Sequence, residues 1–359
     1  MRVANFNGGP ASLPVPVLEE AARDMLDWRG TGMSVMENSH RAKDVIAMVE
    51  EAEADLRSLL GLGEEWAVIF CQGGASLQFA MIAMNFAGPA GRCDYINTGL
   101  WSTKAYNEAR LCGANPRLAA TSEPDDFTFI PEVFDFDPGA AYVHLTANNT
   151  VRGTQWRSYP DCPAPLMADM SSEFLSRPVE VNKFGLIYAG AQKNMGPAGV
   201  TVVALRRELA GRARPGLPNL LSYPVYIDNE SMYNTPPVWS IYICGLTFKW
   251  LKNTVGGLEA VAELNRVKAE TLYRFLDQSG GFYRGTARPD SRSRMNVTFH
   301  LPGQELNDRF KKEAQVAGLE GLGGHRSVGG LRASLYNAVT LDDVNKLIEF
   351  MREFQRIRG

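Results

Sequence analysis

The chain has 359 residues, of which 45% are hydrophobic, and a formal net charge of -3 at pH 7. This length exceeds what one hydrophobic core usually supports, so we expect one large and one smaller domain. The charge balance lacks the basic excess that nucleic-acid binding requires, which excludes nucleic acid as an expected partner.

The five cysteines are widely spaced, odd in number and include no Cys-x-x-Cys pair, so we expect neither a disulfide framework nor a metal site. The N-terminus lacks the apolar core of a signal peptide. No run of about 18 apolar residues suggests a membrane span. These features predict a soluble, cytoplasmic protein with no membrane partner.

Along the N-terminal part of the chain, apolar residues recur at helical spacing from Pro16 to Trp28. A long amphipathic helix is predicted over residues 43–60, ending at the C-cap glycine Gly61. Residues 66–71 then form a continuous apolar run that predicts a buried strand.

Short apolar runs continue through the middle of the chain, separated by helical or irregular segments. Buried strands joined by crossovers predict a parallel or mixed sheet covered by helices on both faces. The runs are residues 93–97, 142–146, 166–169, 186–189 and 199–205.

The pattern changes near residue 259, where strands and helices follow one another at shorter spacing. We expect a large domain over residues 16–258 and a small α/β domain over residues 259–359. The predicted elements of the small domain are helices over residues 257–277, 305–317 and 341–355 and strands over residues 294–301 and 331–335.

The stretch YAGAQKNMGPAG at residues 188–199 places Lys193 where a predicted strand enters a glycine-rich turn. Asp169 ends an earlier predicted strand. A lysine that can form a Schiff base and a carboxylate that can keep a pyridine nitrogen protonated are the arrangement that a pyridoxal 5'-phosphate (PLP) enzyme requires. An isolated lysine here would be interpreted as an ordinary surface residue. Together with Asp169, Lys193 predicts PLP chemistry.

Other residues near strand ends suit the same cofactor. The Gly-Gly-Ala75-Ser76 turn before a helix offers backbone N–H groups and a hydroxyl to a phosphate, although it could simply be a capped tight turn. Trp101 could stack on a planar ring or belong to the core. Thr150 could donate to the ring oxygen or occupy a turn.

Arginines are the natural partners of carboxylates and phosphates. Arg326 and Arg332 flank a Ser-Val-Gly-Gly turn beside His325, and Arg41 follows His40. The segment from His325 to Arg332 looks suited to bring several hydrogen-bond donors to one anion. Arg152 is interpreted as a solvated surface group.

With these motifs together, the chain resembles the phosphoserine aminotransferases, a family of class V PLP-dependent aminotransferases, over essentially its whole length. The matching motifs are NFNGGPA at 5–11, MENSHR at 36–41, FCQGGASLQF at 70–79, ADMSS at 168–172, residues 188–199, NTPP at 234–237, GLTFKWLK at 245–252 and HRSVGGLRASLYN at 325–337.

The resemblance implies a fold-type I PLP transferase: a large domain with a mostly parallel seven-stranded sheet between helices, a smaller C-terminal α/β domain, and residues 1–15 packing near the active site. It also implies a homodimer with the site at the subunit interface.

The resemblance assigns roles residue by residue. Lys193 and Asp169 would be catalytic. The cofactor shell would add Ala75, Ser76, Trp101, Thr150 and Gln192, with Asn234 and Thr235 from the neighbouring subunit. The substrate anions would be held by His40, Arg41, His325, Arg326 and Arg332.

The implied reaction moves an amino group from L-glutamate to 3-phosphohydroxypyruvate, giving O-phospho-L-serine and 2-oxoglutarate in serine biosynthesis. A second role in pyridoxal phosphate (pyridoxine) biosynthesis through 4-phosphohydroxy-L-threonine occurs in the family. The chain departs from the family pattern at three places: Gly8 replaces a serine of some relatives, Ala75-Ser76 replaces glycine and arginine, and Val151-Arg152 replaces a commoner acidic residue.

Rival interpretations are another class V enzyme acting on a small 2-oxo acid, a cysteine desulfurase, a non-catalytic binding protein, and a nicotinamide-dependent dehydrogenase. No cysteine lies in a late glycine- and serine-rich loop, as a desulfurase needs, and no Gly-x-Gly-x-x-Gly follows the first strand. The pair Asp169 and Lys193 argues against a binding protein.

Overall fold

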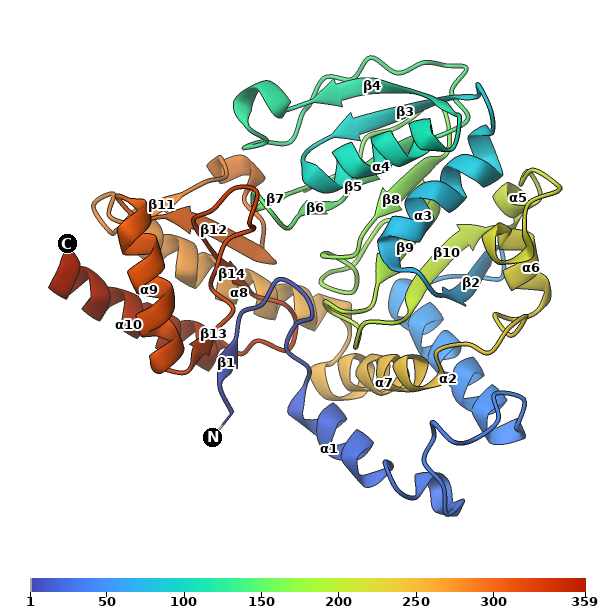
Figure 1. Ribbon diagram of the computed structural model, residues 1–359, viewed down its shortest axis with the longest axis horizontal. Coiled ribbons are helices and arrows are strands. Elements are labelled where there is room, and N and C mark those ends of the chain that lie inside the picture. The colour runs from blue at the N-terminus through green and yellow to red at the C-terminus, as the bar shows by residue number, and fades with distance from the viewer. Residues whose placement is uncertain (1) are drawn as a thin grey trace.

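A seven-stranded sheet forms the centre of the larger part of the molecule in the computed structural model, which describes residues 2–359. Figure 1 shows helices against both faces of this sheet. Its strands, in spatial order, are β2 (Trp66–Cys71), β10 (Thr201–Arg206), β9 (Phe184–Gly190), β8 (Leu166–Asp169), β5 (Val143–Thr146), β3 (Arg92–Asn97) and β4 (Asn115–Thr121).

The sheet is parallel except at β10, which runs antiparallel to both β2 and β9. The central strands are buried along their length, which explains why they are continuous apolar runs in the sequence. The predicted α/β fold with a mostly parallel seven-stranded sheet is confirmed.

Two helical layers cover the sheet. On one face, α2 (Lys43–Leu60) packs with α7 (Val238–Lys249); on the other face lie α3 (Gly74–Ile82), α4 (Leu100–Leu111) and α6 (Tyr223–Asp228). Helix α2 has the predicted bounds and ends at Gly61, whose φ of 66° is left-handed. Helix α7 was not predicted, because it is apolar all round and shows no amphipathic period.

The boundaries of α1 and α3 differ from the prediction. Helix α1 (Val15–Arg23) ends before Trp28, which is buried in a short 3-10 turn. Helix α3 begins at Gly74, just after the left-handed Gly73 with φ 85°, so it includes Ala75 and Ser76, which were expected in a turn before the helix. The shift places Ala75 and Ser76 in the first turn of α3.

A second core is built by the C-terminal part of the chain. Here an antiparallel sheet of β11 (Arg284–Gly285), β12 (Asn296–His300) and β14 (Leu331–Ser334) packs with three helices. The helices are α8 (Leu258–Asp277), α9 (Gln304–Val316) and α10 (Leu341–Arg358). The domain limits 16–258 and 259–359 stay a prediction.

The N-terminal segment joins this second core. Strand β1 (Ala4–Asn5) pairs in parallel with β13 (Leu319–Glu320), and Phe6 is fully buried among C-terminal residues. The remaining short elements are β6 (Asn148–Asn149), β7 (Thr154–Gln155) and α5 (Arg207–Ala210). Ala4 and Phe6 therefore belong to the core of the C-terminal part.

Candidate active site

The carboxyl ends of the parallel strands lie at one edge of the sheet, where ligands bind in open α/β sheets. Asp169 is the last residue of β8, and Lys193 follows the end of β9. Thr150 follows β6, which continues from β5. Because β5, β8 and β9 are adjacent, three residues far apart in the sequence lie at the same edge.

Lys193 is buried, and its amine has one hydrogen-bond partner: Nζ donates to Thr150 Oγ1 at 3.0 Å. Nζ also lies 5.9 Å from the centre of the Trp101 ring. Burial lowers the pKa of Lys193 to about 8; the charge of Asp169 opposes this effect and that of Arg332 adds to it. A substantial fraction of the amine is therefore neutral and nucleophilic near pH 8.

Asp169 is buried at the end of β8 and accepts a hydrogen bond from the backbone N–H of Ser171 at 2.9 Å. Burial raises its pKa above the ordinary value, while Ser171 and the charge of Lys193 pull it down. A cationic partner beside this carboxylate would offset its desolvation. The protonated nitrogen of a pyridine ring is such a partner.

Trp101, in the first turn of α4, leaves a polar atom unpaired. Its indole Nε1 is buried without a hydrogen-bond partner in the part of the chain that the structure describes. The ammonium of Lys104 lies 4.6 Å from the centre of the same ring. Two ammonium groups therefore lie within 6 Å of the ring centre, which suits the place to a planar anionic ligand.

The turn between β2 and α3 suits a phosphate. The first N–H groups of a helix have no intrahelical acceptor, and the N-terminal turn of α3 contains Ala75 and Ser76. A side chain on Gly73 would come within 2.6 Å of Leu77, so this turn depends on glycine. Only β10 separates β2 from β9, which puts the strands about 10 Å apart. The residues present thus fit a bound PLP at this edge.

Arg332, on β14, reaches the site from the C-terminal part. Its Nη1 donates to the backbone oxygen of Thr150 at 3.2 Å, whereas its Nε is buried without a partner among the described residues. His325 is half-buried, and its pKa is lowered by burial and by the charges of Arg332, Arg326 and Lys104. Arg332, Arg326 and Lys104 thus form a cationic cluster around His325, whose lowered pKa favours the neutral ring.

Five further predicted residues have no hydrogen bond or ion pair to Lys193 or Arg332 within the described part of the chain: His40, Arg41, Gln192, Asn234 and Thr235. His40 accepts a hydrogen bond from Arg41 Nε at 3.3 Å, in the loop before α2. Asn234 and the backbone of Thr235 contact Gln72, just before the turn that starts α3. Gln192 contacts the N-terminal segment through its backbone oxygen, which accepts from Ala11 N at 2.9 Å.

Two side chains at this edge, those of Lys104 and Tyr336, were not predicted from the sequence. Lys104 follows Trp101 by three residues and would have been found had helix α4 been predicted, since that spacing shares a helix face. Tyr336 follows Arg332 by four residues, and its hydroxyl donates to Gly8 O at 3.1 Å. Tyr336 lies two residues beyond the end of β14, so the alternation of side chains along that strand gave no signal for it.

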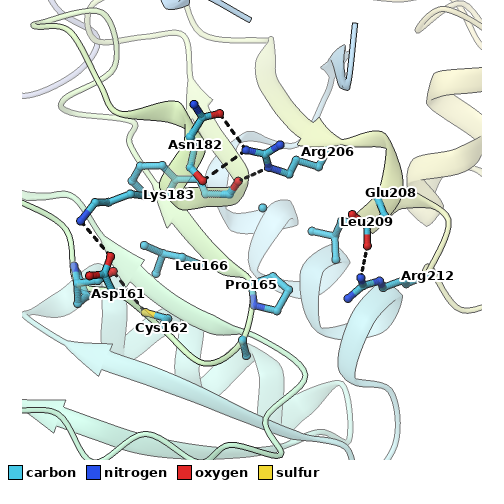
Figure 2. A pocket seen from close by; sticks show the side chains of 14 residues that line it. Asp161, Cys162, Pro165, Leu166, Asn182, Lys183, Arg206, Glu208, Leu209 and Arg212 are labelled. Carbon is cyan, nitrogen blue, oxygen red and sulfur yellow. Dashed lines mark hydrogen bonds and ion pairs between the residues drawn. The ribbon is translucent and has the colours of Figure 1, made fainter. Parts of the chain in front are cut away.

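A separate cavity of about 440 Å³ lies at the opposite edge, near the starts of β8 and β9 (Figure 2). Its charged groups already have partners: Lys183 pairs with Asp161 at 3.2 Å, and Arg212 with Glu208. Arg206 Nη2 donates to Asn182 Oδ1 at 3.1 Å. Because Lys193 follows the end of β9 and the cavity lies near the start of that strand, a ligand in this cavity would not reach Lys193.

Within residues 2–359, no group of three histidine, cysteine or acidic side chains is placed to hold a metal ion. Across the same residues, every helix is too short or too polar to span a lipid bilayer.

The chain matches the family model described as aminotransferase class-V over residues 3–347. It is 52% identical to a phosphoserine aminotransferase of Desulfosudis oleivorans, covering 100% of this chain and 99% of that protein. Identity to the Bacillus subtilis phosphoserine aminotransferase is 50%, covering 99% of each chain.

Solved structures agree with the sequence relatives. A phosphoserine aminotransferase from Bacillus circulans subsp. alkalophilus superposes with a TM-score of 0.97 at 49% identity, covering 100% of this chain and 99% of that one. The PLP-bound enzyme from Trichomonas vaginalis superposes with a TM-score of 0.93 at 40% identity, covering 98% of this chain and 100% of that one.

Proposed function

The chain belongs to the class V aminotransferase family, and from that premise we propose that it transfers the amino group of L-glutamate to 3-phosphohydroxypyruvate. The products are O-phospho-L-serine and 2-oxoglutarate. The enzyme is a PLP-dependent aminotransferase, as expected from the sequence, and its substrates are small molecules. The observation that carries the proposal is a buried lysine beside a buried carboxylate at the ligand-binding edge of the sheet.

When bound, PLP supplies an aldehyde that condenses with amines and a ring that accepts electrons from the substrate α carbon. Lys193 would be the amine that holds the cofactor and, once released, carries a proton between the α carbon and the cofactor carbon C4'. Its lowered pKa suits both tasks, because the neutral amine attacks carbon and the ammonium returns the proton.

Asp169 would keep a proton on the ring nitrogen, since its buried carboxylate is stabilised by an adjacent positive charge. Trp101 would cover the ring, Thr150 and Gln192 would border it, and the first turn of α3 with Ala75 and Ser76 would hold the phosphate. These roles follow from position and chemistry.

The substrate anions would be bound by Arg326 and Arg332 of the cationic cluster, together with His325. Among the described residues, no hydrogen bond or ion pair joins His40 or Arg41 to this cluster, and we propose that they reach the site of a second chain in a homodimer. Asn234 and Thr235 would reach the neighbour's cofactor phosphate in the same way. We place the dimer in the cytoplasm, because charged phosphate esters cross membranes only at high energetic cost.

The choice of acceptor tests the substrate assignment. Two or more charge-assisted hydrogen bonds to the phosphate should raise kcat/KM for 3-phosphohydroxypyruvate over hydroxypyruvate by at least about 10²-fold. The measurement is glutamate-dependent formation of the two amino acids under identical conditions. Equal values would point instead to a class V aminotransferase that acts on an unphosphorylated 2-oxo acid.

A further inference from the structure

The N-terminal segment lies directly against the candidate site. Gly8 O accepts a hydrogen bond from the Tyr336 hydroxyl at 3.1 Å, and Ala11 N donates to Gln192 O at 2.9 Å. A Cβ built on Gly9 would lie 3.4 Å from Lys193 Cγ. Residues 8–11 therefore form one wall beside the lysine.

We propose that Gly8 is a positioning residue for Arg332, because its missing side chain leaves the space in which the Arg332 guanidinium lies and so fixes where Arg332 can hold a substrate anion. The inference rests on the proposed function, in which Arg332 binds a carboxylate or phosphate of the substrate.

The space over Gly8 is filled by the arginine. A Cβ built on Gly8 would lie 2.3 Å from Nη2, 2.5 Å from Cζ and 3.0 Å from Nε of Arg332. Contacts this short between non-bonded heavy atoms are repulsive, so any other residue at position 8 displaces the guanidinium.

Glycine is required at position 8 for space rather than for backbone conformation. Gly8 is absent from the residues with positive φ, whereas its neighbour Gly9 has φ 131°. An alanine at position 8 is therefore compatible with the local backbone. Its cost falls on Arg332, and the colliding atoms are at the end of a flexible side chain that can move without unfolding the protein.

In the position that Gly8 allows it, the Arg332 guanidinium has a donor available for an anion. Nη1 is fixed by the backbone oxygen of Thr150 at 3.2 Å, and Nε is buried without a partner among the described residues. A buried unpartnered donor on a charged group is unfavourable until an acceptor arrives. A substrate carboxylate or phosphate oxygen would satisfy it.

The same position couples Arg332 to Lys193 electrostatically, since the charge of Arg332 contributes to the lowered pKa of the lysine. Moving the guanidinium away should raise that pKa. A purely structural role of Gly8 would leave it unchanged, so the titration of Lys193 reports the position of the arginine independently of substrate binding.

The experiment compares Gly8→Ala with the wild type in the PLP-loaded enzyme, using 2-oxoglutarate as the probe. We expect Kd for 2-oxoglutarate to rise about tenfold, the loss of roughly one charge-assisted hydrogen bond, with thermal stability retained. In the apoprotein, the pH profile of Lys193 acylation should shift to higher pH. Asn7→Ala is the matched control. Asn7 is exposed, and its truncation adds no atom to the space over Gly8, so Arg332 can stay where it is.

Arg332→Ala separates this inference from the proposed function. If Arg332→Ala weakens 2-oxoglutarate binding and Gly8→Ala changes neither Kd nor the Lys193 profile, Arg332 keeps its role and the inference about Gly8 is overturned. If Arg332→Ala also binds 2-oxoglutarate normally, the anion-binding role of Arg332 fails and the inference fails with it. Gly8→Ser is a second variant with the same expected displacement.

Discussion

Two lysines are buried in this molecule, and they differ in their partners. Lys193 is 9% exposed and Lys268 is 3% exposed. Burial lowers the pKa of both, to about 8 for Lys193 and about 7 for Lys268. Burial and a shifted pKa alone therefore do not distinguish a reactive lysine from a structural one.

The hydrogen bonds distinguish the two lysines. Lys268 Nζ on α8 donates to three backbone oxygens, those of Leu335, Tyr336 and Val339, at 2.9–3.0 Å. Each of its three protons has an acceptor, so the ammonium is fully used in holding the segment after β14. Lys193 has one hydroxyl partner and a buried carboxylate nearby, which leaves its amine available for chemistry.

The largest expected effect is on activity when Lys193 is removed. Lys193→Ala should lower kcat by about 10⁴-fold, because the amine that moves the proton is lost. Steady-state transamination by the purified variant measures this. Lys312→Ala, at an exposed position on α9, should keep full activity. Wild-type turnover by Lys193→Ala would contradict the assignment of Lys193 as the reactive lysine.

Next in size is the effect of removing the carboxylate beside Lys193. Asp169→Asn should lower kcat by about 10²-fold, because an amide cannot stabilise a positive ring nitrogen in the buried site. Cofactor retention, measured by absorbance after dialysis, should suffer less than turnover. Unchanged kcat would show that Asp169 does not act on the ring.

Lys268 should behave in the opposite way. Lys268→Met leaves three buried carbonyl oxygens without a donor, and we expect the free energy of unfolding to fall by about 3 kcal/mol. Turnover per folded molecule should fall far less than in Lys193→Ala. Denaturant unfolding and active-site titration measure the two quantities. Lys312→Met is the control, with an expected change below about 0.5 kcal/mol.

The pH dependence of stability gives the smallest effect. In the apoprotein the pKa of Lys193 is about 8, below the ordinary 10.5, so between these values the unfolded chain binds the extra proton. The free energy of unfolding of the wild type should therefore rise with pH relative to Lys193→Met, by at most about 1.4 kcal/mol per pH unit. Parallel curves between pH 8 and 9.5 would contradict the lowered pKa.

The sequence was sufficient where local patterns determine structure. The amphipathic period of α2 and its C-cap glycine gave the helix its bounds, and the apolar runs gave the central strands. Because chemistry gathers at the carboxyl ends of such strands, Asp169, Lys193 and Thr150 could be placed together before the structure was known.

The sequence was insufficient where contacts join distant parts of the chain. Arg332 meets Thr150 across 182 residues, and Gly8 meets Tyr336 across 328. No local pattern encodes such contacts. The direction of β10 was also not predictable, since a fully buried strand has the same apolar sequence whether it runs parallel or antiparallel. The contact between Gly8 and Arg332 also joins distant parts of the chain, so the sequence did not predict that Gly8 leaves space for this arginine.

Borohydride reduction of the PLP-loaded enzyme, followed by peptide mass analysis, tests most directly which buried lysine is reactive. Reduction fixes the carbon–nitrogen bond between the cofactor and the lysine that holds it. The predicted result is a yellow protein that loses its colour on reduction and carries the phosphopyridoxyl label on the peptide containing Lys193 and on no peptide containing Lys268. A label on Lys268, or a reduced protein that releases all its cofactor on unfolding, would contradict the account.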